Sequence, residues 1–218
     1  MSRSDLSDAL DNPMPMTGTV YVVDDDDDLA ELFELLLDSV SLPHQRYATG
    51  EAFLAQATLD QWGCVILDLR MPGMGGMAVL RSLKQKDTPL SVIVVTGHGE
   101  IRSAVEAIQW GAANFLEKPF SNEELLTNVQ RALNDSRIRY TQRGRLRDLQ
   151  RRFDSLSSRE RQVAQLVTRG LTSREIADEL NISARTVEVH RARVLEHLEC
   201  ETSIEIAKLL VELERQRD

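Results

Sequence analysis

Short apolar segments alternate with longer helical patterns through the first part of the chain, and this alternation constrains the fold more than any other feature. Five segments are predicted to be strands: Thr19–Val23, a weaker edge strand near Gln45–Ala48, Cys64–Leu67, Val92–Val95 and Ala113–Leu116. The predicted helices that follow them are Asp28–Val40, Thr49–Thr58, Gly75–Gln85, Ile101–Trp110 and Asn122–Leu133. Five such units in a row predict an α/β fold with a doubly wound, five-stranded parallel sheet.

Polar residues stand where the predicted strands end. These are Asp24 and Asp25 after the first strand, Asp68 after the third, Thr96 after the fourth and Lys118 after the fifth. Ligands of doubly wound sheets bind beyond these carboxyl ends. Close carboxylates repel each other unless a cation lies between them, and Mg²⁺ prefers such oxygen ligands. With a hydroxyl and an ammonium to hold an anion, the set predicts a phosphoryl-transfer site with a carboxylate nucleophile.

The acidic run Asp24–Asp28 also has a simpler interpretation. A run of aspartates is commonly a solvated loop or a helix N-terminus, where the helix dipole favours negative charge. We assign Asp27 and Asp28 to the helix start, leave Asp26 open, and take the first two residues after the strand as the candidate ligands. The functional interpretation is favoured because each polar group ends a different strand.

The charge of the chain is distributed unevenly. The net charge is −9, yet residues up to Ser136 carry 9 basic and 21 acidic side chains, whereas Arg137 to Arg193 carry 14 basic and 7 acidic ones. A basic segment can face nucleic acid, but it can equally be a solvated surface. The change of sign predicts a domain boundary near Arg137.

We expect four segments along the chain. They are a disordered leader (1–18), a first domain (19–134), a basic linker (135–154) and a second domain (155–218). The linker lacks proline, and its apolar residues follow roughly helical spacing. This favours a helix that prolongs the last helix of the first domain, with a weak point at Gly144, over a flexible basic linker.

The second domain is predicted to be all-α, with four helices. Two capping boxes, Ser157-x-x-Glu160 and Thr172-x-x-Glu175, open the first two helices. The short turn Asn181–Ser183 leads to a third helix, Ala184 to about Leu198, and a fourth spans about Ser203–Leu213. Two short helices joined by a three-residue turn form a helix-turn-helix.

The third of these helices has two distinct faces. At about 100° per residue, the core side carries Val187, Val194, Leu195 and Leu198. The opposite side carries Arg185, Val189, Ala192 and Glu196, with Glu188 and Arg193 at its flanks. Exposed apolar residues beside arginines suit the DNA major groove. There the apolar side chains can contact thymine methyls, and the arginines can reach guanine or phosphate. The alternative is a helical bundle with a mixed surface.

The first domain resembles the receiver domains of bacterial response regulators. The motifs that carry the resemblance are Val22-Val-Asp-Asp25, Leu67-Asp-Leu-Arg-Met-Pro-Gly-Met-Gly-Gly76, Val95-Thr-Gly-His98 and Phe115-Leu-Glu-Lys-Pro-Phe120. The resemblance implies a flavodoxin-like fold in which Asp68 accepts a phosphoryl group from a sensor histidine kinase. It implies that Asp24, Asp25, Asp68 and the backbone carbonyl of Arg70 hold Mg²⁺. Thr96 and Lys118 would contact the phosphoryl oxygens, Thr96 and Phe115 would form the switch, and the Lys118–Pro119 peptide would be cis.

The second domain resembles the LuxR-type helix-turn-helix. The matching residues are Leu156-Ser-Ser-Arg-Glu160, Gly170, Arg174-Glu-Ile-Ala177 and Ile182-Ser-Ala-Arg-Thr-Val-Glu-Val-His190. Together with the receiver-like part, the chain resembles the NarL/FixJ family, nearest its FixJ-like branch. The candidate DNA contacts are Arg185, Thr186, Glu188, Val189, Ala192 and Arg193. Many relatives carry Lys where this chain has Glu188, so a base contact there stays open: Glu accepts from cytosine or lies outside the groove.

The resemblance implies a transcriptional regulator, not an enzyme, that is activated by phosphorylation, dimerises and binds promoter DNA. Its expected partners are a histidine kinase, double-stranded DNA and a second copy of itself, with RNA polymerase left open. Two distant cysteines and the lack of a run of about 20 apolar residues indicate a cytoplasmic protein with no membrane partner.

Two rival functions are kept. One is a Mg²⁺-dependent aspartyl phosphatase, although such enzymes typically use Asp-x-Asp and the residue two after Asp68 is Arg70. The other is a receiver that no longer responds to phosphate, joined to a permanently active DNA-binding domain. The complete acidic set weighs against this second rival.

Overall fold

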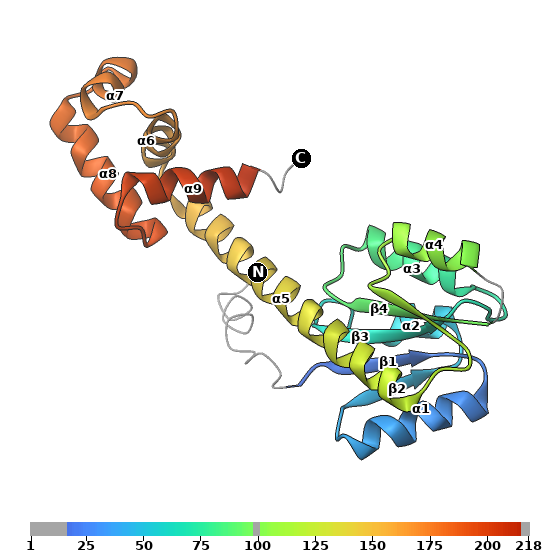
Figure 1. The fold of residues 1–218 in the computed structure, drawn as a ribbon. Helices are drawn as coiled ribbons and strands as arrows, with labels where there is room; N and C mark the ends of the chain where they lie inside the picture. Colours follow the sequence, from blue (N-terminus) through green and yellow to red (C-terminus); the bar gives the residue numbers. More distant parts are fainter. Residues whose placement is uncertain (1–16, 98–100, 215–218) are drawn as a thin grey trace. The chain divides into compact units, whose positions relative to one another are not determined.

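The computed structural model describes residues 17–97 and 101–214 (Figure 1). Most of the predicted disordered leader, and His98 of the third receiver motif, therefore lie outside the described residues. The chain divides into two compact units, the first ending at Tyr140 and the second beginning at Thr141.

The first unit contains a five-stranded parallel sheet. Its strands are β1 (Thr19–Val23), β2 (His44–Tyr47), β3 (Gly63–Asp68), β4 (Ser91–Thr96) and β5 (Asn114–Glu117). Their order in the sheet is β2-β1-β3-β4-β5, and every neighbouring pair is parallel. The predicted α/β fold class is confirmed. The strand order reverses between β1 and β3, so this is the switch point at which ligands of such sheets bind.

Helices cover both faces of the sheet. They are α1 (Asp27–Ser39), α2 (Gly50–Gln56), α3 (Gly76–Gln85), α4 (Ile101–Gln109) and α5 (Asn122–Ser155). Side chains of α1 and α5, such as Phe33 and Leu125, pack on one face, and those of α2, α3 and α4 pack on the other (Figure 1). Burial on both faces explains why β3 and β4 are almost uninterrupted apolar runs.

Helix α5 continues far beyond Leu133, which confirms the prediction that a helix prolongs the last helix of the first domain. It runs for 34 residues and is not interrupted at Gly144, the predicted weak point. In the first unit, the buried hydroxyl of Ser136 accepts from the amide of Gly63 and donates to the carbonyl of Pro89, both at 2.8 Å. In the second unit, Leu146 and Leu149 are buried in the hydrophobic core. The segment expected to be a linker therefore contributes packed residues to each unit.

The second unit is helical, as predicted. Helices α6 (Ser158–Thr168), α7 (Ser173–Leu180), α8 (Ala184–Leu198) and α9 (Ser203–Glu214) follow α5. Both predicted capping boxes are present, and Ser183 caps α8 by accepting from the amide of Thr186. Asn181 ends α7 in the left-handed conformation, with φ of 54°. Asparagine tolerates this conformation better than most residues, and this explains the tight turn before α8.

Within 17–97 and 101–214, no helix is both long and apolar enough to cross a membrane. Helix α5 has the length, but arginines occur throughout its second half.

The burial of Leu149 gives a test of where the second unit begins. We expect Leu149→Ala to lower the free energy of unfolding of this unit by about 2–5 kcal/mol, because it leaves a cavity in the core. Both tryptophans, Trp62 and Trp110, belong to the first unit, so tryptophan fluorescence follows that unit alone. Far-UV circular dichroism follows both units. Denaturant titrations monitored by fluorescence and by circular dichroism therefore separate the unfolding transitions of the two units.

The matched control is Ile204→Ala, since Ile204 lies in the same unit but is 69% exposed. This variant should change the free energy of unfolding by no more than about 0.5 kcal/mol. If Leu149→Ala is as mild as the control, helix residues after Thr141 are not part of the core of the second unit.

Candidate phosphoryl-acceptor site and nucleic-acid interface

Three charged side chains meet at the carboxyl end of the sheet. Asp68 ends β3, Asp24 follows the adjacent strand β1, and Lys118 follows β5. The Nζ atom of Lys118 lies 2.9 Å from Oδ1 of Asp68 and 3.5 Å from Oδ2 of Asp24. Because β4 separates β5 from β3 in the sheet, the long lysine side chain spans the end of β4 to reach the two carboxylates.

Backbone groups hold the two carboxylates in place. Oδ1 of Asp24 accepts from the amide of Asp26 at 2.9 Å, and Oδ2 of Asp68 accepts from the amide of Arg70 at 2.5 Å. Asp24 is 2% exposed and Asp68 is 7% exposed. Each carboxylate therefore turns one oxygen to the backbone and the other to the ammonium of Lys118.

Helix α3 begins directly against the end of β3. A Cβ atom placed on Gly76 would lie 2.1 Å from the carbonyl oxygen of Asp68, so only glycine allows this approach. The loop between β3 and α3 is fixed from α2, where Oε1 of Glu51 accepts from the amide of Met74 at 2.8 Å. The loop that carries Arg70 is therefore held at both ends.

Burial and charge shift the pKa values of this cluster in ways that can be traced. Burial raises the pKa of Asp24, and the Asp26 amide and the Lys118 charge only partly offset it. For Lys118, burial lowers the pKa, but the hydrogen bond to Asp68 and the charges of both aspartates raise it above its usual value overall. The lysine is therefore firmly protonated, while Asp24 is an acid whose ionised form is disfavoured.

Thr96 and Phe115 lie on one face of the sheet. Thr96 pairs with Glu117 across β4 and β5, and Phe115 pairs with Val94, two residues earlier. Because side chains alternate along a strand, Thr96 and Phe115 point to the same face. Thr96 is 3% exposed, whereas Phe115 is 43% exposed. The predicted switch pair thus consists of a buried hydroxyl and an outward aromatic ring.

The acidic run after β1 divides by role. Asp24 is buried and Asp25 is exposed, whereas Asp26 caps α1 and Asp27 and Asp28 lie in its first turn. The solvated interpretation therefore holds for the last two, and Asp26 is now placed as a cap.

The donors predicted for Mg²⁺ are all oxygens. They are the carboxylates of Asp24, Asp25 and Asp68 and the carbonyl of Arg70. Within 17–97 and 101–214, no three histidine, cysteine, aspartate or glutamate side chains already converge as a metal cage. The oxygen set nevertheless fits a hard divalent ion, and a second cation beside Asp24 would favour the ionised form that burial disfavours. The Lys118–Pro119 peptide is cis, as the resemblance implied.

Helix α8 presents the predicted DNA contacts on its exposed side. Arg185, Thr186, Glu188, Val189, Ala192 and Arg193 are all exposed. Val187, Val194 and Leu198 are buried on the other side, and Leu195 is half-buried. The guanidinium of Arg193 also lies 4.0 Å from the buried Glu160 carboxylate. The two faces are therefore divided as the angular analysis predicted.

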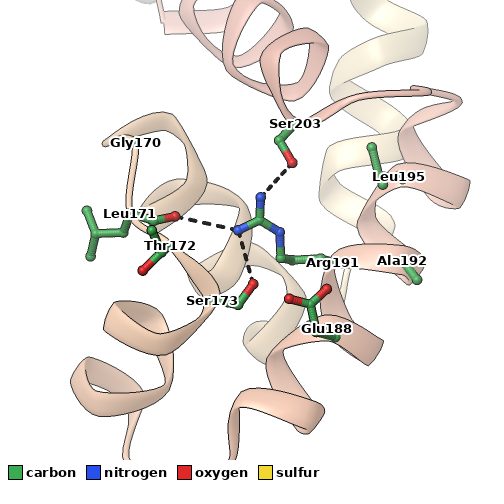
Figure 2. Close-up of a pocket in the computed structure, with 9 residues that line it drawn as sticks. All are labelled: Gly170, Leu171, Thr172, Ser173, Glu188, Arg191, Ala192, Leu195 and Ser203. Atoms are coloured by element: carbon green, nitrogen blue, oxygen red, sulfur yellow. Dashed lines mark hydrogen bonds between the residues drawn. The ribbon is translucent and has the colours of Figure 1, made fainter.

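A surface depression of about 580 Å³ adjoins this face (Figure 2). Glu188 and Ala192 line it together with residues at the starts of α7 and α9, and the side chain of Arg191 extends across it. The sequence analysis did not single out Arg191. Its partners belong to other elements, so the periodicity of α8 contains no signal for it.

Each unit matches a known family. Residues 20–130 match the response regulator receiver domain, and residues 154–210 match the bacterial regulatory proteins of the luxR family. The two matches follow the division of the chain into a sheet-containing unit and a helical unit.

Similarity also extends along the whole chain. It is 39% identical over 197 residues to the transcriptional regulatory protein FixJ of Azorhizobium caulinodans, which covers 90% of this chain and 93% of that protein. It is 38% identical to the tetrathionate response regulatory protein TtrR of Salmonella typhimurium, covering 87% and 90%. Among solved structures, the response regulator StyR matches with a TM-score of 0.79 and 35% identity, covering 90% and 99%. Full-length FixJ from B. japonicum matches with a TM-score of 0.55 and 35% identity, and the match covers 91% of this chain and 98% of that one.

The raised pKa of Asp24 predicts how its charge affects stability. Without divalent ions at neutral pH, we expect Asp24→Asn to raise the thermal midpoint of the first unit by a few degrees, because the fold then buries no disfavoured carboxylate. The gain should disappear as the pH falls through the raised pKa, since wild-type Asp24 then takes up a proton and is neutral as well. Tryptophan fluorescence follows the transition.

Asp28→Asn is the control, because Asp28 is exposed in the first turn of α1. It should leave the midpoint unchanged or lower it slightly, since a negative charge at a helix N-terminus is favourable. A midpoint that falls in Asp24→Asn at neutral pH would contradict a net cost of burying this carboxylate.

Proposed function

The chain belongs to the response regulators with a receiver domain and a LuxR-type DNA-binding domain, a family of phosphorylation-controlled transcription regulators, and we propose that Asp68 is its phosphoryl acceptor. The observation that carries this proposal is the meeting of Asp68, Asp24 and Lys118 at the switch point of the sheet. Asp68 stands at the end of the central strand β3, and its Oδ1 faces the only charge of opposite sign in this group of three.

In the proposed reaction, a carboxylate oxygen of Asp68 attacks the phosphorus of a kinase phosphohistidine. The bond from phosphorus to the imidazole nitrogen breaks, and the imidazole leaves with the electron pair. The ammonium of Lys118 and the hydroxyl of Thr96 then contact the phosphoryl oxygens, where negative charge is concentrated. Asp24, Asp25, Asp68 and the Arg70 carbonyl would hold Mg²⁺, which supplies further positive charge to the phosphoryl oxygens.

The proposed switch follows from the same contacts. A phosphoryl group on Asp68 attracts Thr96, and the space that Thr96 releases accepts the exposed ring of Phe115. The face formed by residues 101–133 then changes and pairs with a second copy of the chain. Phosphorylation acts in this way as a local charge change with a distant effect.

The proposed dimer presents two helix-turn-helix units to paired half-sites in promoter DNA. Helix α8 enters the major groove, with Arg185 on a phosphate and Val189 and Ala192 toward base edges. A regulator of this kind works beside promoter DNA in the bacterial cytoplasm, and RNA polymerase is its candidate downstream partner. We propose no catalytic activity beyond its own phosphorylation.

The acceptor assignment predicts the behaviour of Asp68→Asn. The amide cannot form an acyl phosphate, so this variant should take up no phosphoryl group from acetyl phosphate and Mg²⁺. Intact-protein mass spectrometry measures the uptake, and tryptophan fluorescence verifies the fold. Removing Mg²⁺ with a chelator should abolish most uptake in the wild type as well.

Asp60→Asn is the matched control, because Asp60 is an exposed aspartate in the loop before β3. It should be phosphorylated as efficiently as the wild type. Unchanged uptake by Asp68→Asn would disprove the acceptor assignment.

The DNA-binding face predicts distinct effects for three substitutions in α8. Arg185→Ala should weaken binding to all duplexes. It should also reduce the slope of log affinity against log salt concentration by about the amount of one phosphate contact. Val189→Ala should leave the salt dependence unchanged and relax the preference at one base pair by roughly 1 kcal/mol or less, because it removes only an apolar contact. Binding isotherms at several salt concentrations, on matched and mismatched duplexes, measure both quantities.

Val187→Ala is the control, because Val187 is fully buried. It should destabilise the second unit by roughly 0.5–3 kcal/mol without a specific sequence effect. If Val189→Ala behaves in the same way as Val187→Ala, the face assigned to DNA is wrong.

A further inference from the structure

Arg191 joins helix α8 to the starts of two other helices (Figure 2). Its Nη2 atom donates to Oγ of Ser203, the first residue of α9, at 2.6 Å. Its Nη1 atom donates to the carbonyl of Leu171 and to Oγ of Ser173, the first residue of α7, both at 3.5 Å. All three acceptors are neutral oxygens, so the guanidinium contacts them through directional hydrogen bonds and not through ion pairs.

Apart from Arg191 and the ion pair of Arg193 with Glu160 of α6, α8 packs on its unit mainly through apolar side chains. Val187, Val194 and Leu198 are the buried side chains of α8. Apolar burial is non-directional, and it resists removal of a helix from the core more than small rotations about the helix axis. Base recognition is sensitive to such rotations, because hydrogen bonds depend steeply on distance and angle.

Arg191 lies within the proposed DNA-contacting stretch of α8, between Val189 and Ala192. Glu188 and Ala192, two residues of the proposed face, line the same depression that the Arg191 side chain crosses. Hydrogen bonds from Arg191 therefore limit rotation of α8 about its axis, and this rotation sets the direction in which the neighbouring side chains point.

We propose that Arg191 is a positioning residue that fixes the orientation of α8, so that the base-facing side chains reach their bases together. This rests on the proposed DNA-binding face. The ligand is double-stranded DNA, and Arg191 contributes to sequence discrimination without contacting a base. Ser203 is its main anchor, since it provides the shortest of the three hydrogen bonds.

The test uses the full chain and two duplexes of equal length. One is selected from a random library by the wild-type protein, and the other is a scrambled version of it. Arg191→Met keeps most of the side-chain length and removes the donors, and it should reduce the ratio of the two affinities by about tenfold. Ser203→Ala leaves the arginine charge intact and should reduce the ratio by a few-fold. Neither variant should change the salt dependence of binding to the scrambled duplex.

Arg185→Met is the matched control, because Arg185 is an exposed arginine on the same helix. It should weaken both affinities equally and lower the salt dependence by about one charge. If instead neither Arg185→Met nor Val189→Ala affects binding, the DNA-binding face itself is wrong. Failure of the Arg191 variants while these two behave as expected overturns only the positioning role.

Two results would overturn the proposal. The starts of α7 and α9 carry the positive ends of helix dipoles, so a DNA phosphate beside Arg191 is the competing explanation. An equal loss of both affinities in Arg191→Met, with a salt dependence lowered by about one charge, would establish that phosphate contact instead. The second result is an Arg191→Met variant in which neither affinity changes, so that the ratio of the two affinities also stays the same. If Arg191→Met unfolds the second unit by circular dichroism, Ser203→Ala decides alone, and an unchanged ratio in that variant is the contradicting result.

Discussion

The ammonium of Lys118 lies against two buried carboxylates, and the candidate site of the first unit is built around this contact. Asp24 and Asp68 are two carboxylates with little access to water, and the ammonium of Lys118 supplies a positive charge beside both. The three residues come from the ends of three different strands, and only a parallel sheet in this order brings those ends together. The cost of burying Asp24 remains, as its raised pKa indicates. A second cation beside Asp24 would offset this cost, which is consistent with the proposed Mg²⁺ site.

In the second unit, the main structural requirement is that the exposed helix α8 is held in one orientation. Its core is formed by apolar residues of all four helices and of the end of α5. Capping boxes fix the starts of α6 and α7, and Arg191 links α8 to α7 and α9. Directional hydrogen bonds therefore supplement a non-directional core, in the region where we propose that DNA is read.

Much of this could be predicted from the sequence, because local patterns determine it. Apolar runs predicted the strands, and the polar residues after them predicted that Asp68 and Lys118 meet at one edge of the sheet. Capping boxes predicted the helix starts of the second unit. Contacts between distant segments could not be predicted in this way. The periodicity of Leu146 and Leu149 indicated a helix but not the core that buries them, and the bonds of Arg191 depend on how α7 and α9 pack.

We propose that charge on Asp68 controls DNA binding by the whole chain. The most direct measurement is the affinity of the full chain for its selected duplex with and without beryllofluoride, which mimics an aspartyl phosphate. The account predicts that beryllofluoride with Mg²⁺ increases the affinity of the wild type and leaves Asp68→Asn unchanged. Equal affinities of the wild type under both conditions, with the reagent bound, would contradict it.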